Sequence, residues 1–228
     1  MYRKTALIVG VLFIIGTVSG VLSGIMTSPI QNVPETLDAI STYESRWILG
    51  TLLILVMGFA LAMVPVLLYP VFKKHNEVLA LAAVLFRGVL EMVCYLAIAM
   101  SMLLLVSANQ SPDAAALLIG AGEWLGQILA LVFSIGALMI YFLFYQTRLI
   151  PRWLSGCGFV GAMLYFAAPL VSMFSTQHPA LSLGSPLGFL MAPLAVQEMV
   201  FAVWLILKGF SQSPASTIKQ QVLSTTGV

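Results

Sequence analysis

The chain alternates between long runs of apolar residues and short polar segments. Six of the apolar runs are long enough to cross a membrane as an α-helix, which takes about 20 residues. They cover residues 5–27, 47–72, 77–107, 114–145, 152–175 and 186–209. The third and fourth runs exceed that length, so they must tilt or extend beyond the hydrocarbon. The pattern predicts an all-α bundle of six transmembrane helices within residues 1–210, followed by a disordered cytoplasmic tail over residues 211–228.

The polar segment between the first two runs has a pattern of its own. Pro34 followed by Glu35 and Asp38 is typical of a helix start. Leu37 and Ile40 then follow at roughly helical spacing. We therefore expect either a short helix on the outer surface of the bundle or an ordinary ordered loop at this place.

The composition supports a membrane protein. Hydrophobic residues make up 61% of the chain and charged residues only 8%, whereas soluble domains carry about 25% charged residues. Such a chain cannot cover a surface that faces water. The net charge of +2 is small and the basic residues are scattered, which argues against a nucleic-acid partner.

The basic residues indicate the orientation in the membrane. If the N-terminus is cytoplasmic, the outer segments hold only one basic residue, Arg46. The basic residues of the cytoplasmic segments are then Arg3, Lys4, Lys73, Lys74, Arg148, Arg152, Lys208 and Lys219. Cytoplasmic loops carry an excess of Lys and Arg. The sequence therefore predicts that both termini lie in the cytoplasm.

A few ionisable residues lie inside the predicted spans. Such groups are costly in hydrocarbon, by about 2.5–3.5 kcal/mol or more, and mark functional sites by default. They are Arg87 and Glu91 in the third span, Glu123 in the fourth and Glu198 in the sixth. Residues four apart share a helix face, so Arg87 can pair with Glu91, and Gln127 accompanies Glu123 as Gln197 accompanies Glu198. We expect one polar site, made by these six residues, between the third, fourth and sixth spans.

The charges of this expected site do not balance. One arginine and three glutamates leave it at −2 if all are ionised. Either at least one glutamate carries a proton, or a cation resides there. We expect Arg87 to hold Glu91 ionised, which leaves Glu123 and Glu198 as the candidates for binding a proton.

Two functional hypotheses follow. In the first, the protein is a carrier or binder of a proton, a cation or a small amphiphilic molecule at this buried Arg/Glu site. In the second, it is a structural or regulatory membrane protein whose buried charges only fix helix packing. An intramembrane enzyme is the least favoured hypothesis, and no catalytic residue is assigned.

The sequence gives no support for a metal or a cofactor. Both histidines, His75 and His178, fall in loops predicted on opposite sides of the membrane, so they cannot share a metal ion. No lysine lies in mid-span, where a retinal Schiff base would need one, and no phosphate-binding Gly-Lys loop occurs. We expect no metal site and no cofactor.

Small residues mark one helix for close packing. Gly16, Gly20 and Gly24 repeat every four residues in the first span, so a neighbouring backbone can approach closely along this stripe. That neighbour lies either in the same chain, which is the commoner outcome, or in a second copy of an oligomer.

Two segments carry a resemblance to a known family. They are RKTALIVGVLFIIGTVSGVLS, from Arg3, and LYPVFKKHNEVLALAAVLFRGVLEMV, from Leu68 to Val93. With the six-span length, they resemble the bacterial membrane proteins of domain-of-unknown-function family 4386, and the resemblance covers nearly the whole chain. It implies a multi-pass protein of the bacterial inner membrane and assigns no catalytic residue.

Overall fold

The computed structural model describes residues 2–31, 42–107, 111–175, 181 and 185–211, and their regular structure is helical. The helices are α1 (Tyr2–Gln31), α3 (Glu44–Phe72), α4 (Glu77–Val84), η1 (Leu85–Leu90), α5 (Glu91–Ser107), α6 (Pro112–Thr147), α7 (Arg152–Phe174) and α8 (Gly188–Leu207). The elements α4, η1 and α5 form one continuous rod, so the described residues contain six rods long and apolar enough to cross a membrane. This confirms the predicted six-helix fold. The expected surface helix and the expected tail lie outside the described residues, apart from a few at their edges.

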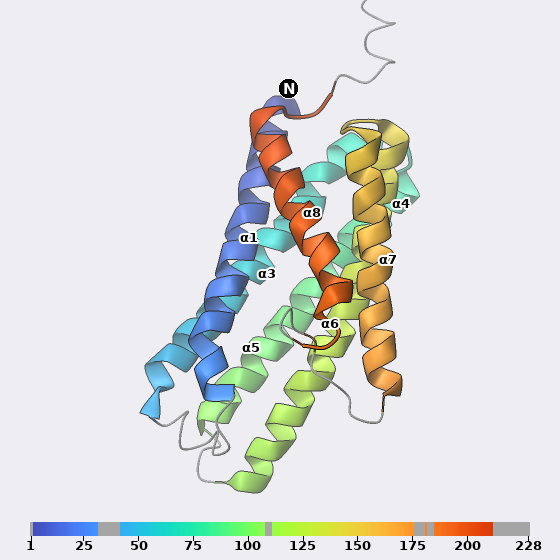
Figure 1. Cartoon of the computed structure of the whole chain (residues 1–228). Coiled ribbons are helices and arrows are strands. Elements are labelled where there is room, and N and C mark those ends of the chain that lie inside the picture. The colour runs from blue at the N-terminus through green and yellow to red at the C-terminus, as the bar shows by residue number, and fades with distance from the viewer. Residues whose placement is uncertain (1, 32–41, 108–110, 176–180, 182–184, 212–228) are drawn as a thin grey trace, which may run out of the picture.

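The two ends of the bundle differ in charge. The helix ends that lie beside the N-terminus carry Arg3, Lys4, Lys73, Lys74, Arg148, Arg152 and Lys208, and we call this the basic end (Figure 1). The opposite end, at which α3 and α6 begin, carries Arg46, Glu44 and Asp113, and we call it the acidic end. Arg3 also caps α8 across the basic end, because its guanidinium donates to the carbonyl oxygens of Leu205, Ile206 and Leu207. The structure contains no membrane, so the cytoplasmic placement of the basic end stays a prediction.

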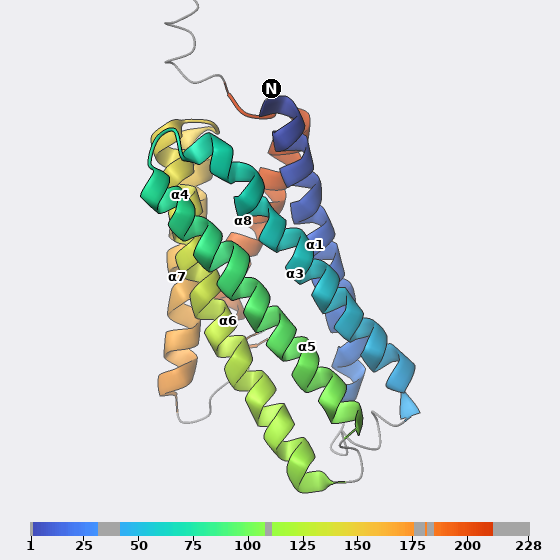
Figure 2. The ribbon, with the colours of Figure 1, turned by 180° about the vertical axis from the view of Figure 1, so that it is seen from behind.

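The six rods are arranged as a ring. Each rod packs against the rods before and after it in sequence, and α8 closes the ring by packing against α1. Figures 1 and 2 show α8 with α1 and α7 on one face of the bundle, and α3 with the rod of α4, η1 and α5 on the other. The third and sixth rods therefore face each other across the interior of the ring.

The main hydrophobic core fills the half of the ring near the basic end. Phe13 of α1, Phe72 of α3, Phe144 of α6 and Phe201 of α8 are all buried. Their rings meet edge to face, with centroids 5.4 Å apart for Phe13–Phe201, 4.9 Å for Phe72–Phe144 and 5.1 Å for Phe144–Phe201. Aromatic pairs favour this geometry, and these four rings close the interior at this end.

The glycine stripe of α1 packs within the chain along most of its length. A Cβ atom at Gly16 would overlap the side chain of Leu61, and one at Gly20 would overlap Met57. Both neighbours belong to α3, which packs closely along α1. Gly24 has open space around it. Two of the three predicted contact positions are therefore used by α3 of the same chain.

Candidate functional site

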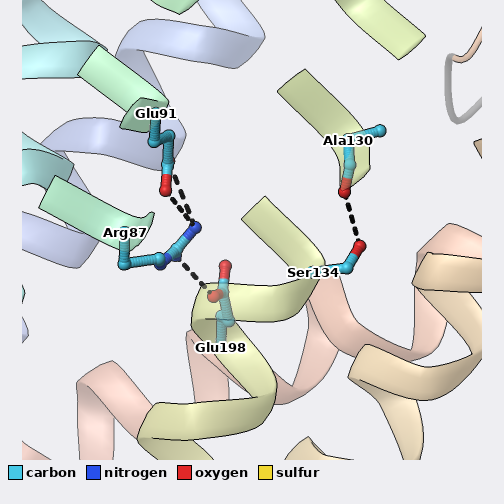
Figure 3. A network of polar contacts seen from close by, with 5 residues as sticks. All are labelled: Arg87, Glu91, Ala130, Ser134 and Glu198. Carbon is cyan, nitrogen blue, oxygen red and sulfur yellow. Dashed lines mark hydrogen bonds and ion pairs between the residues drawn. The ribbon is translucent and has the colours of Figure 1, made fainter. Parts of the chain in front are cut away.

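One arginine joins two carboxylates inside the ring. The Nη1 atom of Arg87, in η1, donates to both carboxylate oxygens of Glu91, at 3.2 and 3.1 Å. Its Nη2 atom donates to Oε1 of Glu198, in α8, at 2.9 Å (Figure 3). We call Arg87, Glu91 and Glu198 the ion cluster. The pairing of Arg87 with Glu91 was predicted from their spacing, and the structure also brings Glu198 to the same guanidinium.

The ion cluster lies near half the depth of the bundle. Arg87 is ten residues from the start of α4 at Glu77, and Glu198 is nine residues from the end of α8 at Leu207. At about 1.5 Å per residue, both lie roughly 14–15 Å from the basic end of their rods. The hydrocarbon core of a bilayer is about 30 Å thick, so these charges fall close to its midplane.

A local irregularity in the third rod positions Arg87. The residues Leu85–Leu90 form a π-helical segment between the α-helical parts of this rod, and such segments are frequent at functional sites. Gly136 of α6 lies directly against it, since a Cβ atom there would come within 2.9 Å of the Arg87 backbone nitrogen. The guanidinium then stacks on the ring of Phe133, with Cζ 4.0 Å from the ring centroid. The close approach of α6 thus adds a cation–π contact to the two ion pairs.

The three members of the ion cluster differ in burial. Only 1% of the side-chain surface of Arg87 and of Glu91 is exposed, whereas Glu198 keeps 12%. If all three groups are ionised, the ion cluster carries a net charge of −1. An unbalanced charge inside a low-dielectric bundle is costly. Binding of one positive charge would therefore stabilise the ionised cluster.

Two further buried polar groups lie beside Glu198. The hydroxyl of Tyr141, in α6, and Oε1 of Gln197, in α8, are buried and have no hydrogen-bond partner among the described residues. These two groups lie close enough to interact with each other, and Tyr141 also interacts electrostatically with Glu198. Buried polar groups in proteins almost always have a partner, and an exception calls for an explanation such as a water or an ion. Tyr141 and Phe133 were not expected in the site, because aromatic residues in a membrane span carry no sequence signature of their own.

The two glutamines make structural contacts with α7. The Nε2 atom of Gln197 donates to the carbonyl oxygen of Leu154 at 3.0 Å. The Nε2 atom of Gln127 donates to Oγ of Ser172 at 2.7 Å. Gln197 thus lies next to the ion cluster. Gln127 links α6 to α7 at a distance from the ion cluster.

Glu123 lies outside the ion cluster, contrary to the expected convergence of three glutamates. Its side chain is exposed. It precedes Gln127 by one turn, and Gln127 is level with Ser172 near the end of α7, so Glu123 lies level with the acidic end of α7 instead of at mid-depth. The reason is the length of α6, whose 36 residues span about 54 Å.

The described residues contain no group of three or more His, Cys, Asp or Glu side chains that could hold a metal ion. Cys94 and Cys157 are free thiols, and Cys94 is buried beside the ion cluster in sequence, three residues after Glu91. The chemistry that the site offers is therefore that of carboxylates, one guanidinium and neutral hydrogen-bonding groups.

A ring of six apolar rods around an Arg/Glu cluster defines a multi-pass membrane protein with a polar interior. The family model described as "Domain of unknown function (DUF4386)" matches residues 8–209. The chain belongs to this family, as its two characteristic segments indicated. No curated protein matches the chain, and no solved structure matches it.

Proposed function

We propose that this membrane protein is a carrier that binds a proton or another small cation at Glu198, inside the bacterial inner membrane. The observation that carries the proposal is that one guanidinium serves two carboxylates, 3.1 Å from Glu91 and 2.9 Å from Glu198. When all three groups are ionised, the charge of −1 lies near the midplane, where water is scarce and charge is costly. A proton or a cation at Glu198 makes the ion cluster neutral.

The two carboxylates have different parts in this proposal. Glu91 receives two hydrogen bonds from Arg87 on the same rod, so its charge is matched within one element. Glu198 receives one bond from Arg87 across the ring, and the Tyr141 hydroxyl and the Gln197 carbonyl lie beside it. Glu198 therefore exchanges its partner more readily, and Tyr141 and Gln197 are available to hold a bound cation or water.

Binding at Glu198 would also change the packing of the bundle. The Arg87–Glu198 bond ties α8 to the third rod across the ring. A proton on Glu198, or a cation that takes the place of Arg87, weakens this tie. A carrier needs a coupling of this kind between ligand binding and helix movement, because its site must open to each side in turn.

Reconstituted liposomes test this proposal. A potential set by a potassium gradient and a potassium ionophore drives cation entry, an entrapped pH-sensitive dye reports protons, and separate runs with sodium and with a small alkylammonium ion cover other cations. We expect flux through the wild-type protein and its loss in Glu198→Gln. Glu44→Gln is the matched control, because Glu44 is exposed at the start of α3, far from the ion cluster.

The competing hypothesis, a purely structural role for the charges, is favoured by the burial of Arg87 and its stacking on Phe133. It predicts that Glu198→Gln changes only thermal stability. Unchanged flux, together with cation-induced thermal shifts equal to those of the wild type, would overturn the carrier proposal in favour of this one.

A further inference from the structure

Space for a water molecule lies beside Glu198 within the ring. Its side chain retains 12% of its surface although it bonds to a fully buried arginine. The outward face of α8 is marked by the exposed side chains of Val196 and Val200. Glu198 is two residues from each, about 200° around the helix, and so points the opposite way. The surface that remains accessible on Glu198 therefore borders the interior of the bundle and not the lipid.

This space cannot open toward the basic end. The rings of Phe13, Phe72, Phe144 and Phe201 come from four different rods and fill the interior there. All four are almost completely buried, which leaves no room for water between them.

The interior is more open toward the acidic end, along one face of α6. Phe133, Gly126 and Glu123 share this face, because they are spaced by seven and three residues. Phe133 contacts Arg87. No described residue lies within 4 Å of the position of a Cβ atom at Gly126, and the side chain of Glu123 is exposed. On this face Phe133 and Gly126 are partly exposed and Glu123 is exposed.

The short length of α8 leaves this face of α6 uncovered by that helix. Figure 1 shows α8 beginning partway along the bundle, while α1 and α6 continue toward the acidic end. The residues around its start pack on α7 near the end of that helix, where Leu187 and Met191 contact Ala168, six residues before Phe174.

We infer that a water-filled crevice along this face of α6 leads from the acidic end to Glu198, and that Glu123 is the cation-attracting group at its mouth. This inference rests on the proposed function in taking a cation as the ligand. The crevice gives water and cations access to Glu198 from the acidic end only, and the four buried phenylalanine rings close the basic end. A carboxylate at the mouth of a low-dielectric passage raises the local concentration of cations, which gives Glu123 a function although it lies outside the ion cluster.

Cysteine labelling in lipid nanodiscs tests the crevice without any need for transport. In a background with Cys94→Ala and Cys157→Ala, three single cysteines are compared: Gly126→Cys on the crevice face, Ile128→Cys on the lipid-exposed face and Ala137→Cys beyond Phe133. The probe is trimethylammonium-ethyl methanethiosulfonate, a cationic thiol reagent. We expect Gly126→Cys to react at least about tenfold faster than the other two, because the reagent attacks the thiolate and a thiol in lipid or a dry core does not ionise.

A second comparison tests Glu123. Adding Glu123→Gln to the Gly126→Cys protein should slow the cationic reagent severalfold and leave a neutral methanethiosulfonate reagent unchanged. The crevice is rejected if Gly126→Cys reacts no faster than Ile128→Cys, or if Ala137→Cys reacts equally fast. The role of Glu123 is rejected if both reagents respond alike. Since labelling is measured independently of flux, a failure of the carrier proposal would not alter these outcomes.

Discussion

Arg87 and Glu198 are 111 residues apart in the sequence, and their side chains meet at 2.9 Å in the interior of the bundle. This bond crosses the ring between its third and sixth rods, which lie on opposite sides. It is therefore a link between the two halves of the chain, unlike the bond from Arg87 to Glu91 within one rod. Any event that neutralises Glu198 acts on the arrangement of the whole bundle.

Removing the guanidinium should destabilise the protein strongly. Arg87→Leu leaves Glu91 and Glu198 facing each other in the interior with no positive charge, and breaking a buried ion pair by removing one partner costs about 3–5 kcal/mol. We expect a clear fall in the unfolding temperature of the purified protein in detergent, or loss of folded protein on expression.

The same substitution becomes tolerable once the carboxylates are neutral. The triple variant Arg87→Leu, Glu91→Gln, Glu198→Gln should recover most of the lost stability, because the penalty of Arg87→Leu comes from the unmatched charges. If the triple variant unfolds as early as Arg87→Leu alone, the loss arises from the stacking of Arg87 on Phe133 and not from charge.

Close packing of α6 on the π-helical segment should be sensitive to a single methyl group. In Gly136→Ala the new Cβ atom would lie 2.9 Å from both the backbone nitrogen and the Cβ atom of Arg87. Overpacking of this kind costs about 1–3 kcal/mol, and it should also move the guanidinium away from Glu198.

Gly126→Ala is the matched control on the same helix. In the part of the chain that the structure describes, nothing lies within 4 Å of its Cβ position, and alanine favours a helix over glycine by up to about 1 kcal/mol. Thermal unfolding of the two variants should therefore shift in opposite directions. Equal shifts would show that the contact between Gly136 and η1 does not limit the packing.

The sequence was sufficient to predict the six membrane-spanning rods and one ion pair. Long apolar runs determine the number of membrane helices because hydrocarbon admits little else, and the spacing of Arg87 and Glu91 determines their contact. The glutamate that pairs with Arg87 across the ring was harder to assign. Glu123 and Glu198 looked equivalent in the sequence, and only the length of α6 and the packing of α8 separate them.

The polar partners of the glutamines could not be predicted at all. Gln127 and Gln197 were expected beside glutamates, yet each donates to α7, one to Ser172 and one to the Leu154 carbonyl. A buried amide needs a partner, but the sequence does not say which neighbouring helix supplies it. Phe133 entered the site for a similar reason, because Gly136 allows α6 to approach Arg87.

The contact between Gln127 and Ser172 should behave as a structural bond between α6 and α7. Oε1 of Gln127 already lacks a partner, so Ser172→Ala would leave the Nε2 group unsatisfied as well. We expect a loss of about 0.6 kcal/mol, the average for hydrogen bonds between membrane helices, and of no more than about 1.7 kcal/mol, the largest value. The double variant Gln127→Leu, Ser172→Ala removes both polar groups and should be close to the wild type in stability. A double variant that is less stable than Ser172→Ala would show that Gln127 makes another interaction that stabilises the protein more than its bond to Ser172.

The glycine stripe of α1 should divide into two positions that the fold needs and one that it does not. Gly16→Ile forces a branched side chain into the space of Leu61, and Gly20→Ile into that of Met57, so both should separate α1 from α3 and cost about 1–3 kcal/mol. Gly24→Ile enters open space and should leave the unfolding temperature of the monomer unchanged.

The same three variants test whether copies of the chain associate through this stripe, by light scattering of the protein in detergent. Because α3 occupies the first two positions and no described residue covers Gly24, Gly24→Ile should be the variant of the three that lowers the mass of any oligomer. If Gly16→Ile or Gly20→Ile dissociates an oligomer without loss of thermal stability, the stripe faces another chain and its packing against α3 is wrong.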